Sequence, residues 1–184
     1  MRNLSTLLLA LVLLSCGTKK TESSSSDATP LKQENAMVLS NVQIQIPDGW
    51  QQEQPDSKMR VAQLSKIDNV EHKLAVFYFG QQDMVEANLS RWRGQFSEIS
   101  KEEQPEVTSE NITTLKLSGT FKKKPFPMSQ EFVETPDYGM LAAIIPSNEG
   151  PYYLKITGPI SFINNAESDF IEMLNSVETN FPQN

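Results

Sequence analysis

The sequence predicts a domain of the α+β class, a three-layer α/β/α sandwich with a central antiparallel sheet. Two short runs, Leu74–Phe79 and Met140–Ile145, are apolar at every position and suit strands that are covered on both faces. Several other segments alternate between apolar and polar residues, as half-buried strands do. Two longer segments carry apolar stripes at helical spacing, so one helix can cover each face of the sheet.

The elements follow one another in a clear order. Residues 42–46 alternate between aliphatic residues and glutamines, which predicts the first strand. The sequence Pro47-Asp48-Gly49 then predicts a turn, because proline presets φ and glycine tolerates positive φ. A weaker strand pattern covers Met59–Ile67, and Asp68-Asn69 supplies the turn into the first fully apolar strand, which ends at Gly80.

The first helix is predicted to follow Gly80. Val85, Leu89, Trp92 and Phe96 recur at spacings of four, three and four, which places them on one side of a helix. A loop rich in glutamate is expected after this helix. It leads to a strand at 112–121, where apolar and polar residues alternate again.

The longest irregular piece is predicted at 122–137, before the second fully apolar strand. Ser147–Gly150 then predicts a hairpin loop into a strand at 152–157. Gly158-Pro159 opens the last helix. The apolar stripe of that helix consists of Ile163, Ala166, Phe170, Leu174 and Val177.

The N-terminus has the layout of a secretory signal peptide. An apolar run, Leu7–Leu14, follows Arg2 and ends at Ser15-Cys16. The run is too short to span a bilayer, which takes ~20 residues. Leu13–Cys16 resembles the bacterial lipobox, so Cys16, which is the sole cysteine and has no disulfide partner, is predicted to be lipidated with palmitate-type acyl chains.

We therefore expect three regions. Residues 1–15 are predicted to be a lipoprotein signal peptide, 16–37 a lipidated cysteine followed by a flexible Ser-rich tether, and 38–184 a single domain. A tether of this kind has a root-mean-square reach of about 25 Å. Gly17 after the cysteine favours the outer membrane, if the host has one, by resemblance to bacterial lipoprotein sorting rules. The expected location is thus the bacterial cell envelope.

The charge balance is acidic, with a formal net charge of −7. Removal of residues 1–15 takes away Arg2 and no acidic residue, which leaves 15 basic and 23 acidic side chains. Such a chain is repelled by nucleic acid and by anionic lipid headgroups. We expect no nucleic-acid partner, and we expect the membrane to be held through the acyl chains.

Three runs resemble a group of uncharacterised bacterial secreted proteins and lipoproteins: Val76–Gly80, Val85–Phe96 and Gly150–Pro159. That group is similar in layout to the PsbP-like fold, an antiparallel sheet flanked by helices on both sides. The resemblance covers roughly 42–181. It implies a binding or assembly module beside a larger partner, and it transfers no catalytic residue and no photosynthetic role.

Catalytic and metal motifs are sparse. His72 is the sole histidine and is expected to lie in a surface turn, without the partners that a metal site or a general base needs. No metalloprotease, phosphate-loop or nucleophile-elbow motif is present. We expect no metal, no cofactor and no enzymatic activity. A hydrolase that uses carboxylates alone, such as Glu86 or Glu131, is the least favoured alternative.

The candidate binding residues lie mainly in the predicted long loop at 122–137. Large apolar side chains are unusual in such a loop, which indicates a functional rather than a disordered segment. Its candidates are Lys123, Phe126, Met128, Phe132 and Tyr138. Arg91 is a separate candidate for binding a carboxylate.

Two functions remain open at this point. The first is a membrane-anchored, non-enzymatic binding or assembly module with an envelope protein as partner. The second is a carrier of a small apolar ligand or lipid, held between sheet and helix with the long loop as a lid.

Overall fold

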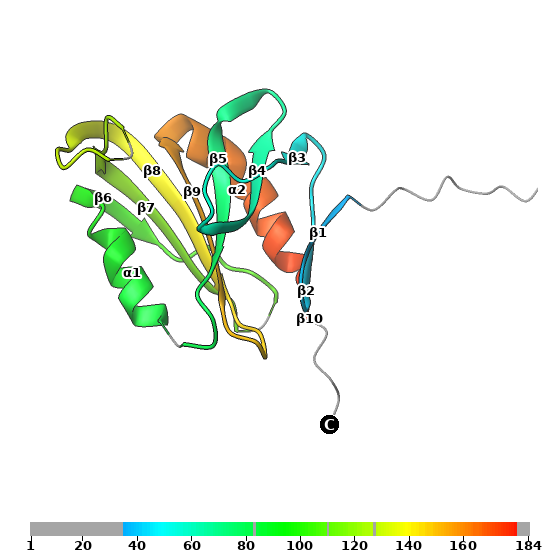
Figure 1. Cartoon of the computed structure of the whole chain (residues 1–184). Coiled ribbons are helices and arrows are strands. Elements are labelled where there is room, and N and C mark those ends of the chain that lie inside the picture. Colours follow the sequence, from blue (N-terminus) through cyan, green and yellow to red (C-terminus); the bar gives the residue numbers. More distant parts are fainter. Residues whose placement is uncertain (1–34, 83, 110, 127, 180–184) are drawn as a thin grey trace, which may run out of the picture. The chain divides into compact units, whose positions relative to one another are not determined.

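The computed structural model describes residues 35–82, 84–109, 111–126 and 128–179, which all belong to one compact unit, Glu34–Asn184. Within these residues the chain forms ten strands and two helices (Figure 1). In chain order they are β1 (Ala36–Leu39), β2 (Val42–Gln45), β3 (Trp50–Gln52), β4 (Arg60–Lys66), β5 (Asn69–Tyr78), α1 (Val85–Arg93), β6 (Phe96–Glu103), β7 (Thr113–Lys123), β8 (Val133–Ile145), β9 (Tyr152–Pro159), α2 (Ile160–Asn175) and β10 (Glu178–Thr179).

Seven strands form the main sheet, in the order β3-β4-β5-β9-β8-β7-β6, and neighbouring strands pair antiparallel throughout. The two runs predicted to be covered on both faces belong to the central strands β5 and β8. Leu74–Val76 and all of Met140–Ile145 are buried. The prediction of an α+β domain with an antiparallel sheet is therefore confirmed.

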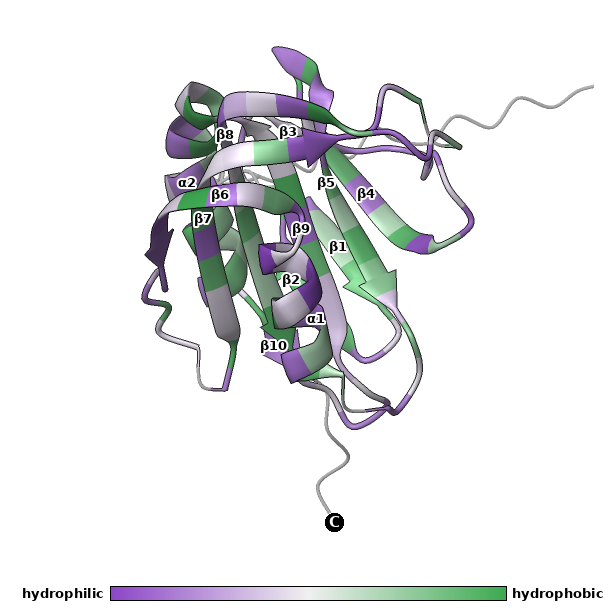
Figure 2. Ribbon diagram, turned by 90° about the vertical axis from the view of Figure 1, so that its left-hand side faces the viewer, coloured by the Kyte–Doolittle hydropathy of each residue, from purple (hydrophilic) through white to green (hydrophobic). Residues whose placement is uncertain are grey.

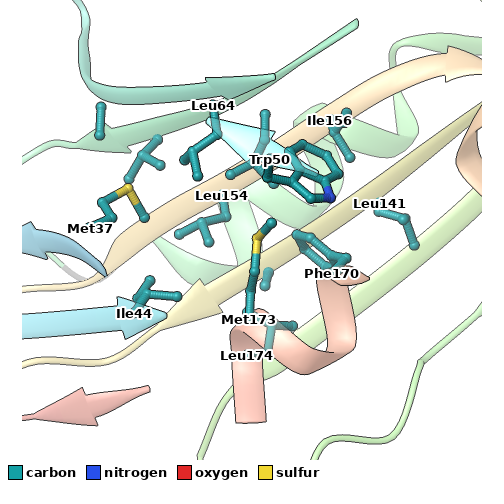
Figure 3. Close-up of a cluster of buried hydrophobic side chains, with 14 of the residues drawn as sticks. Met37, Ile44, Trp50, Leu64, Leu141, Leu154, Ile156, Phe170, Met173 and Leu174 are labelled. Carbon is teal, nitrogen blue, oxygen red and sulfur yellow. The ribbon is translucent and has the colours of Figure 1, made fainter. Parts of the chain in front are cut away.

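Helix α2 and a small second sheet pack against one face of the main sheet. The second sheet has the order β1-β2-β10. Figure 3 shows side chains from the two sheets and α2 pointing toward one another, among them Met37, Ile44, Leu154 and Phe170. Of the stripe predicted for α2, four residues are buried, whereas Val177 lies beyond the end of the helix and is partly buried.

Helix α1 packs against the opposite face. Its buried Leu89 and Trp92 share a core cluster with side chains of β7, β8 and β9, including Leu117 and Met140. Phe96 belongs to the same cluster, but α1 ends at Arg93, so Phe96 is the first residue of β6 and not the last residue of a helical stripe. None of the helices in the described residues is long and apolar enough to cross a membrane.

Three segments differ from the sequence-based expectation. The predicted tether extends to residue 37, but β1 begins at Ala36 and Met37 is fully buried, because β1 pairs with β2 and covers the core beside α2. Of the segment expected to be a glutamate-rich loop, Glu102 and Glu103 belong to β6, an edge strand that pairs with β7, whereas Pro105 and Glu106 lie in the loop that follows. His72 lies in β5 and not in a turn.

The largest correction concerns the predicted irregular piece at 122–137. Strand β7 continues to Lys123 and β8 begins at Val133, so residues 124–132 alone connect them. The pairs Lys122↔Glu134 and Lys123↔Val133 extend the β7–β8 hairpin into the predicted irregular piece. The segment is thus the end of a long hairpin and not a loop that crosses the domain.

Candidate functional site

The structure divides the predicted site residues into three places. Cys16 lies outside the described residues. Phe126, Met128 and Phe132 lie at the end of the β7–β8 hairpin, near Lys123 on its β7 strand. Arg91 is on α1, where its guanidinium donates to Asn88 Oδ1 (2.5 Å) and lies over the Phe79 ring (5.8 Å), so it does not join the hairpin residues.

The end of this hairpin exposes four large apolar side chains. The exposed fractions are 61% for Phe126, 84% for Met128, 54% for Phe132 and 54% for Val133. We call these four residues the hairpin tip. The sequence analysis missed Val133, although an apolar residue next to Phe132 at a strand end was a signal that could have identified it.

The hairpin tip has a defined backbone. Buried Ser129 donates its amide to the Phe126 carbonyl (3.0 Å) and its hydroxyl to the Glu131 carbonyl (3.0 Å). The amide of Glu131 in turn donates to the Ser129 hydroxyl (3.1 Å). Lys124 Nζ lies 5.6 Å from the centre of the Phe132 ring. The apolar side chains are thus held outward by a hydrogen-bonded turn.

Exposed apolar residues also occur on the β4–β5 hairpin, but they do not form one patch there. Met59 and Val61 flank Arg60, which pairs with Phe77, whereas Ile67 and Val70 lie beside the Lys66↔Asn69 pair. The two ends of β4 are about 20 Å apart. The hairpin tip therefore gathers exposed apolar side chains more densely than the β4–β5 hairpin does.

Tyr138, predicted as part of the same loop, is instead 7% exposed and lies on the same side of β8 as Met140 and Ile144, which belong to the core cluster under α1. Figure 2 shows α1 in front of this face of the sheet. The Tyr138 ring stacks on Phe121 (5.2 Å between ring centres), and Lys123 Nζ lies 5.9 Å from the ring centre. Burial, and then the charge of Glu71, raise the pKa of Tyr138. Tyr138 and Lys123 are thus brought together, as neighbours of the hairpin tip.

A pocket of about 280 Å³ opens beside this pair. Its lining side chains come from β4, β5, β7, β8 and β9 and consist of Arg60, Glu71, His72, Lys73, Lys123, Tyr138 and Thr157. His72 is half-buried and packs on the Phe162 ring (4.7 Å between ring centres). Burial lowers its pKa, so His72 is neutral at pH 7.

Two of the pocket's cations are held by carboxylates. Arg60 Nη1 bonds to Asp56 (3.3 Å), and Lys73 bonds to Glu53. Hydrogen bonds from Lys73 and Ser65 lower the pKa of Glu53 to about 2, so this carboxylate is charged at any pH near neutrality. Lys123 forms no salt bridge with a described residue.

A further cation, Lys155 of β9, is partly buried near α1. Its Nζ donates to Gln95 Oε1 (3.0 Å), and it makes no salt bridge within the part of the chain that the structure describes. Burial, followed by the charges of Arg91 and Arg60, lowers the pKa of Lys155 to about 8. The sequence analysis missed it, although a lysine within an apolar strand was a visible signal.

Both interfaces between helix and sheet are filled by side chains. Phe170, Met173 and Leu174 occupy the α2 side, and Leu89 and Trp92 occupy the α1 side. These are the places where the carrier hypothesis puts its ligand, so the geometry gives that hypothesis no specific support. Among the described residues, no group of three or more His, Cys, Asp or Glu side chains is placed to hold a metal ion.

A comparison of the sequence with protein-family models finds no match, and a comparison with curated proteins finds none either. Among solved structures, the chain is similar to the solution structure of cyanobacterial PsbP (CyanoP) from Synechocystis sp. PCC 6803. The TM-score is 0.49 and the identity 10%, with 91% of this chain and 98% of that chain covered. A likeness at this level carries no information about activity, partners or ligands.

Proposed function

We propose that this protein is a lipid-anchored, non-enzymatic binding module of the bacterial cell envelope that docks an envelope protein through its hairpin tip. The observation that carries the proposal is the set of four exposed apolar side chains at the end of the β7–β8 hairpin. Interfaces concentrate their binding energy in a few apolar and aromatic anchors. Phe126, Met128 and Phe132 are residues of that kind, held outward by the turn at Ser129.

The charges around the hairpin tip favour a protein partner over a lipid surface. Three lysines, at 122–124, are followed by Glu131, Glu134 and Asp137 on the same hairpin. Mixed charges around an apolar centre match the polar rim of a protein interface. A segment that binds anionic lipid would carry an excess of positive charge.

The anchor in this proposal is Cys16. Two or more acyl chains hold a protein on a membrane essentially permanently, since each buried CH₂ contributes ~0.8 kcal/mol. The segment between Cys16 and β1 then lets the domain reach partners within about 25 Å of its attachment point. An outer membrane is the favoured site where the host has one.

The same proposal includes the finer description of the fold, a three-layer α/β/α sandwich of the PsbP-like kind. Its support is that α1 and α2 belong to separate core clusters on the two faces of the main sheet. The runs at 76–80, 85–96 and 150–159 resemble a group of uncharacterised bacterial proteins, and the link from that group to the PsbP-like fold rests on the order of the elements. The small sheet β1-β2-β10 shares the α2 layer.

A photo-reactive amino acid placed at Met128 tests the docking. In membranes of the native host, this probe is expected to give one dominant protein adduct after illumination. The control is the same probe at Met59, which is 64% exposed and precedes β4, outside the β7–β8 hairpin. Equal adducts from both positions, or none from Met128, would contradict the proposal.

A further inference from the structure

The pocket beside Tyr138 has a lining rich in hydrogen-bond donors. Both hydrogen bonds that the Arg60 side chain makes to described residues, to Asp56 and Gln63, come from Nη1, so its Nε and Nη2 groups remain available. Guanidinium has five N–H donors, and its geometry suits two oxygens of one anion. The contacts with Asp56 and Gln63 also fix the side chain, which lowers the entropic cost of binding.

Lys123 and two hydroxyls add further donors. Lys123 has no described carboxylate partner and lies over the Tyr138 ring. The Tyr138 side chain is 7% exposed, and no described residue accepts a hydrogen bond from its hydroxyl. Thr157 contributes its hydroxyl from β9. Glu71 is the one carboxylate among the lining residues, and Asp56 and Glu53 pair with Arg60 and Lys73, so Lys123 is the lining cation without a salt bridge to a described residue.

Three cations around one pocket stand out in a chain whose net charge is −7. Lys155 is a further cation on this face of β9; burial, and then the charges of Arg91 and Arg60, lower its pKa to about 8. A cavity with fixed, partly desolvated cations concentrates anions from solution. Its volume of about 280 Å³ accommodates a single small anionic group with its water.

We propose that this pocket binds an oxyanionic group, the carboxylate or phosphate of a small ligand, between Arg60, Lys123 and the Tyr138 hydroxyl. The guanidinium holds two oxygens, the ammonium neutralises charge, and the hydroxyl donates to the remaining oxygen. Lys73 and Thr157 complete the rim. The site adjoins the hairpin tip, because Lys123 pairs with Val133, but its residues are not the four of the tip and the inference does not depend on the docking proposed above.

The test is a titration of the full chain, in a non-ionic detergent, followed by amide NMR shifts. Inorganic phosphate and succinate are the two probes, added separately at constant ionic strength. Saturable shifts are expected at Tyr138 and Thr157 with at least one probe, and the probe that binds identifies the group as phosphate, carboxylate or either. No saturable shift with either probe up to about 20 mM, where even a 1 mM site would be nearly filled, overturns the proposal.

Variants distinguish anion binding at this site from a general electrostatic attraction of anions to the protein. Arg60→Gln and Lys123→Gln are each expected to weaken binding about tenfold or more, because each removes a charged hydrogen bond. Tyr138→Phe keeps the ring and the fold while it removes the hydroxyl, and it is expected to weaken binding several-fold. Lys122→Gln is the matched control, since it makes the same charge change on the neighbouring residue of β7, whose side chain points to the other face.

If Lys122→Gln and Lys123→Gln weakened anion binding equally, the proposed site would be wrong, because the loss of affinity would then follow from the change in net charge alone. The photo-adduct at Met128 reports on a different surface. Loss of anion binding with the adduct intact, or the reverse, therefore distinguishes a failure of this inference from a failure of the proposed function.

Discussion

Lys155 places an ammonium group in the space between β9 and α1, where the Gln95 side chain is its described hydrogen-bond partner. Keeping a charge in such a place costs free energy, because water is partly removed and no carboxylate replaces it. The lowered pKa, about 8 instead of 10.5, expresses that cost. A functional role for this face of the sheet would explain why a cation stands at a position where an apolar residue would be more stable.

Lys155→Met is expected to raise the free energy of unfolding at pH 7 by about 1–2 kcal/mol, the desolvation cost less the lost hydrogen bond. Below pH 8 the lysine is charged in both the folded and the unfolded chain, so the cost is fully present. Between pH 8 and 10.5 the folded chain loses the proton first, so the stability of the wild type rises and the difference shrinks.

Urea unfolding at pH 7 and at pH 9.5 measures both effects. Lys101→Met, at an exposed position of β6, is the control and should show no such pH dependence. A Lys155→Met protein that is less stable than the wild type at both pH values would contradict this explanation.

Single residues also show which burials the sequence could and could not predict. The apolar positions of β5 and β8 were predictable, because six consecutive apolar residues leave no polar face. Gln63 and Ser65 are fully buried, yet their residue types predict exposure. Their burial depends on Glu53, which bonds to both of them from the segment after β3. A contact of this kind is invisible in local periodicity.

At the scale of elements, β6 was missed for a related reason. Of its residues, Phe96 alone is buried, so the strand has no alternation that could reveal it. Its backbone hydrogen bonds to β7, and not its side chains, define it. The pairing of β7 with β8 likewise determines the ends of their hairpin, so Lys122 and Lys123 were predicted to be in a loop because their partners in β8 were unknown.

Gly119→Ala is expected to destabilise this edge. Gly119 has φ +155°, and a Cβ there would overlap the backbone of Glu98 in β6. The free energy of unfolding should fall by about 2–4 kcal/mol, with faster hydrogen exchange in β6. Gly49→Ala is the control, since Gly49 also has a positive φ (+84°) but no atom lies within 4 Å of its Cβ position. A loss no larger than that of Gly49→Ala would show that β6 can move away at little cost.

At the scale of the whole molecule, the antiparallel α+β architecture was predictable, because two fully apolar strands require cover on both faces and two amphipathic helices supply it. The sheet β1-β2-β10 was not, since β10 pairs with β2 across most of the chain. The hairpin tip was half predictable. Its residues were identified, but their place at the end of a hairpin depends on the register of β7 with β8.

Cys16→Ala is expected to move the protein from the membrane fraction to the soluble fraction of its native host, because the acyl chains are the proposed attachment and the chain is acidic. Labelled palmitate should appear on the wild type and be absent from the variant. Ser15→Gly, which leaves the cysteine in place, is the control and should keep both the label and the membrane fractionation. A Cys16→Ala form that stays in the membrane fraction would contradict the anchor.

The docking role of the hairpin tip is tested most directly by replacing its apolar side chains. The triple variant carries Phe126→Ser, Met128→Ser and Phe132→Ser. These side chains are between 54% and 84% exposed, so their replacement should leave the melting temperature within a few degrees of the wild type. A photo-reactive group at Gln130 then reports the yield of partner adduct in host membranes. The control triple variant carries Met59→Ser, Ile67→Ser and Val70→Ser. Our proposal predicts a loss of adduct of tenfold or more for the tip variant alone, as expected for removal of binding anchors worth ~2 kcal/mol each. An unchanged adduct yield from a folded tip variant would contradict it.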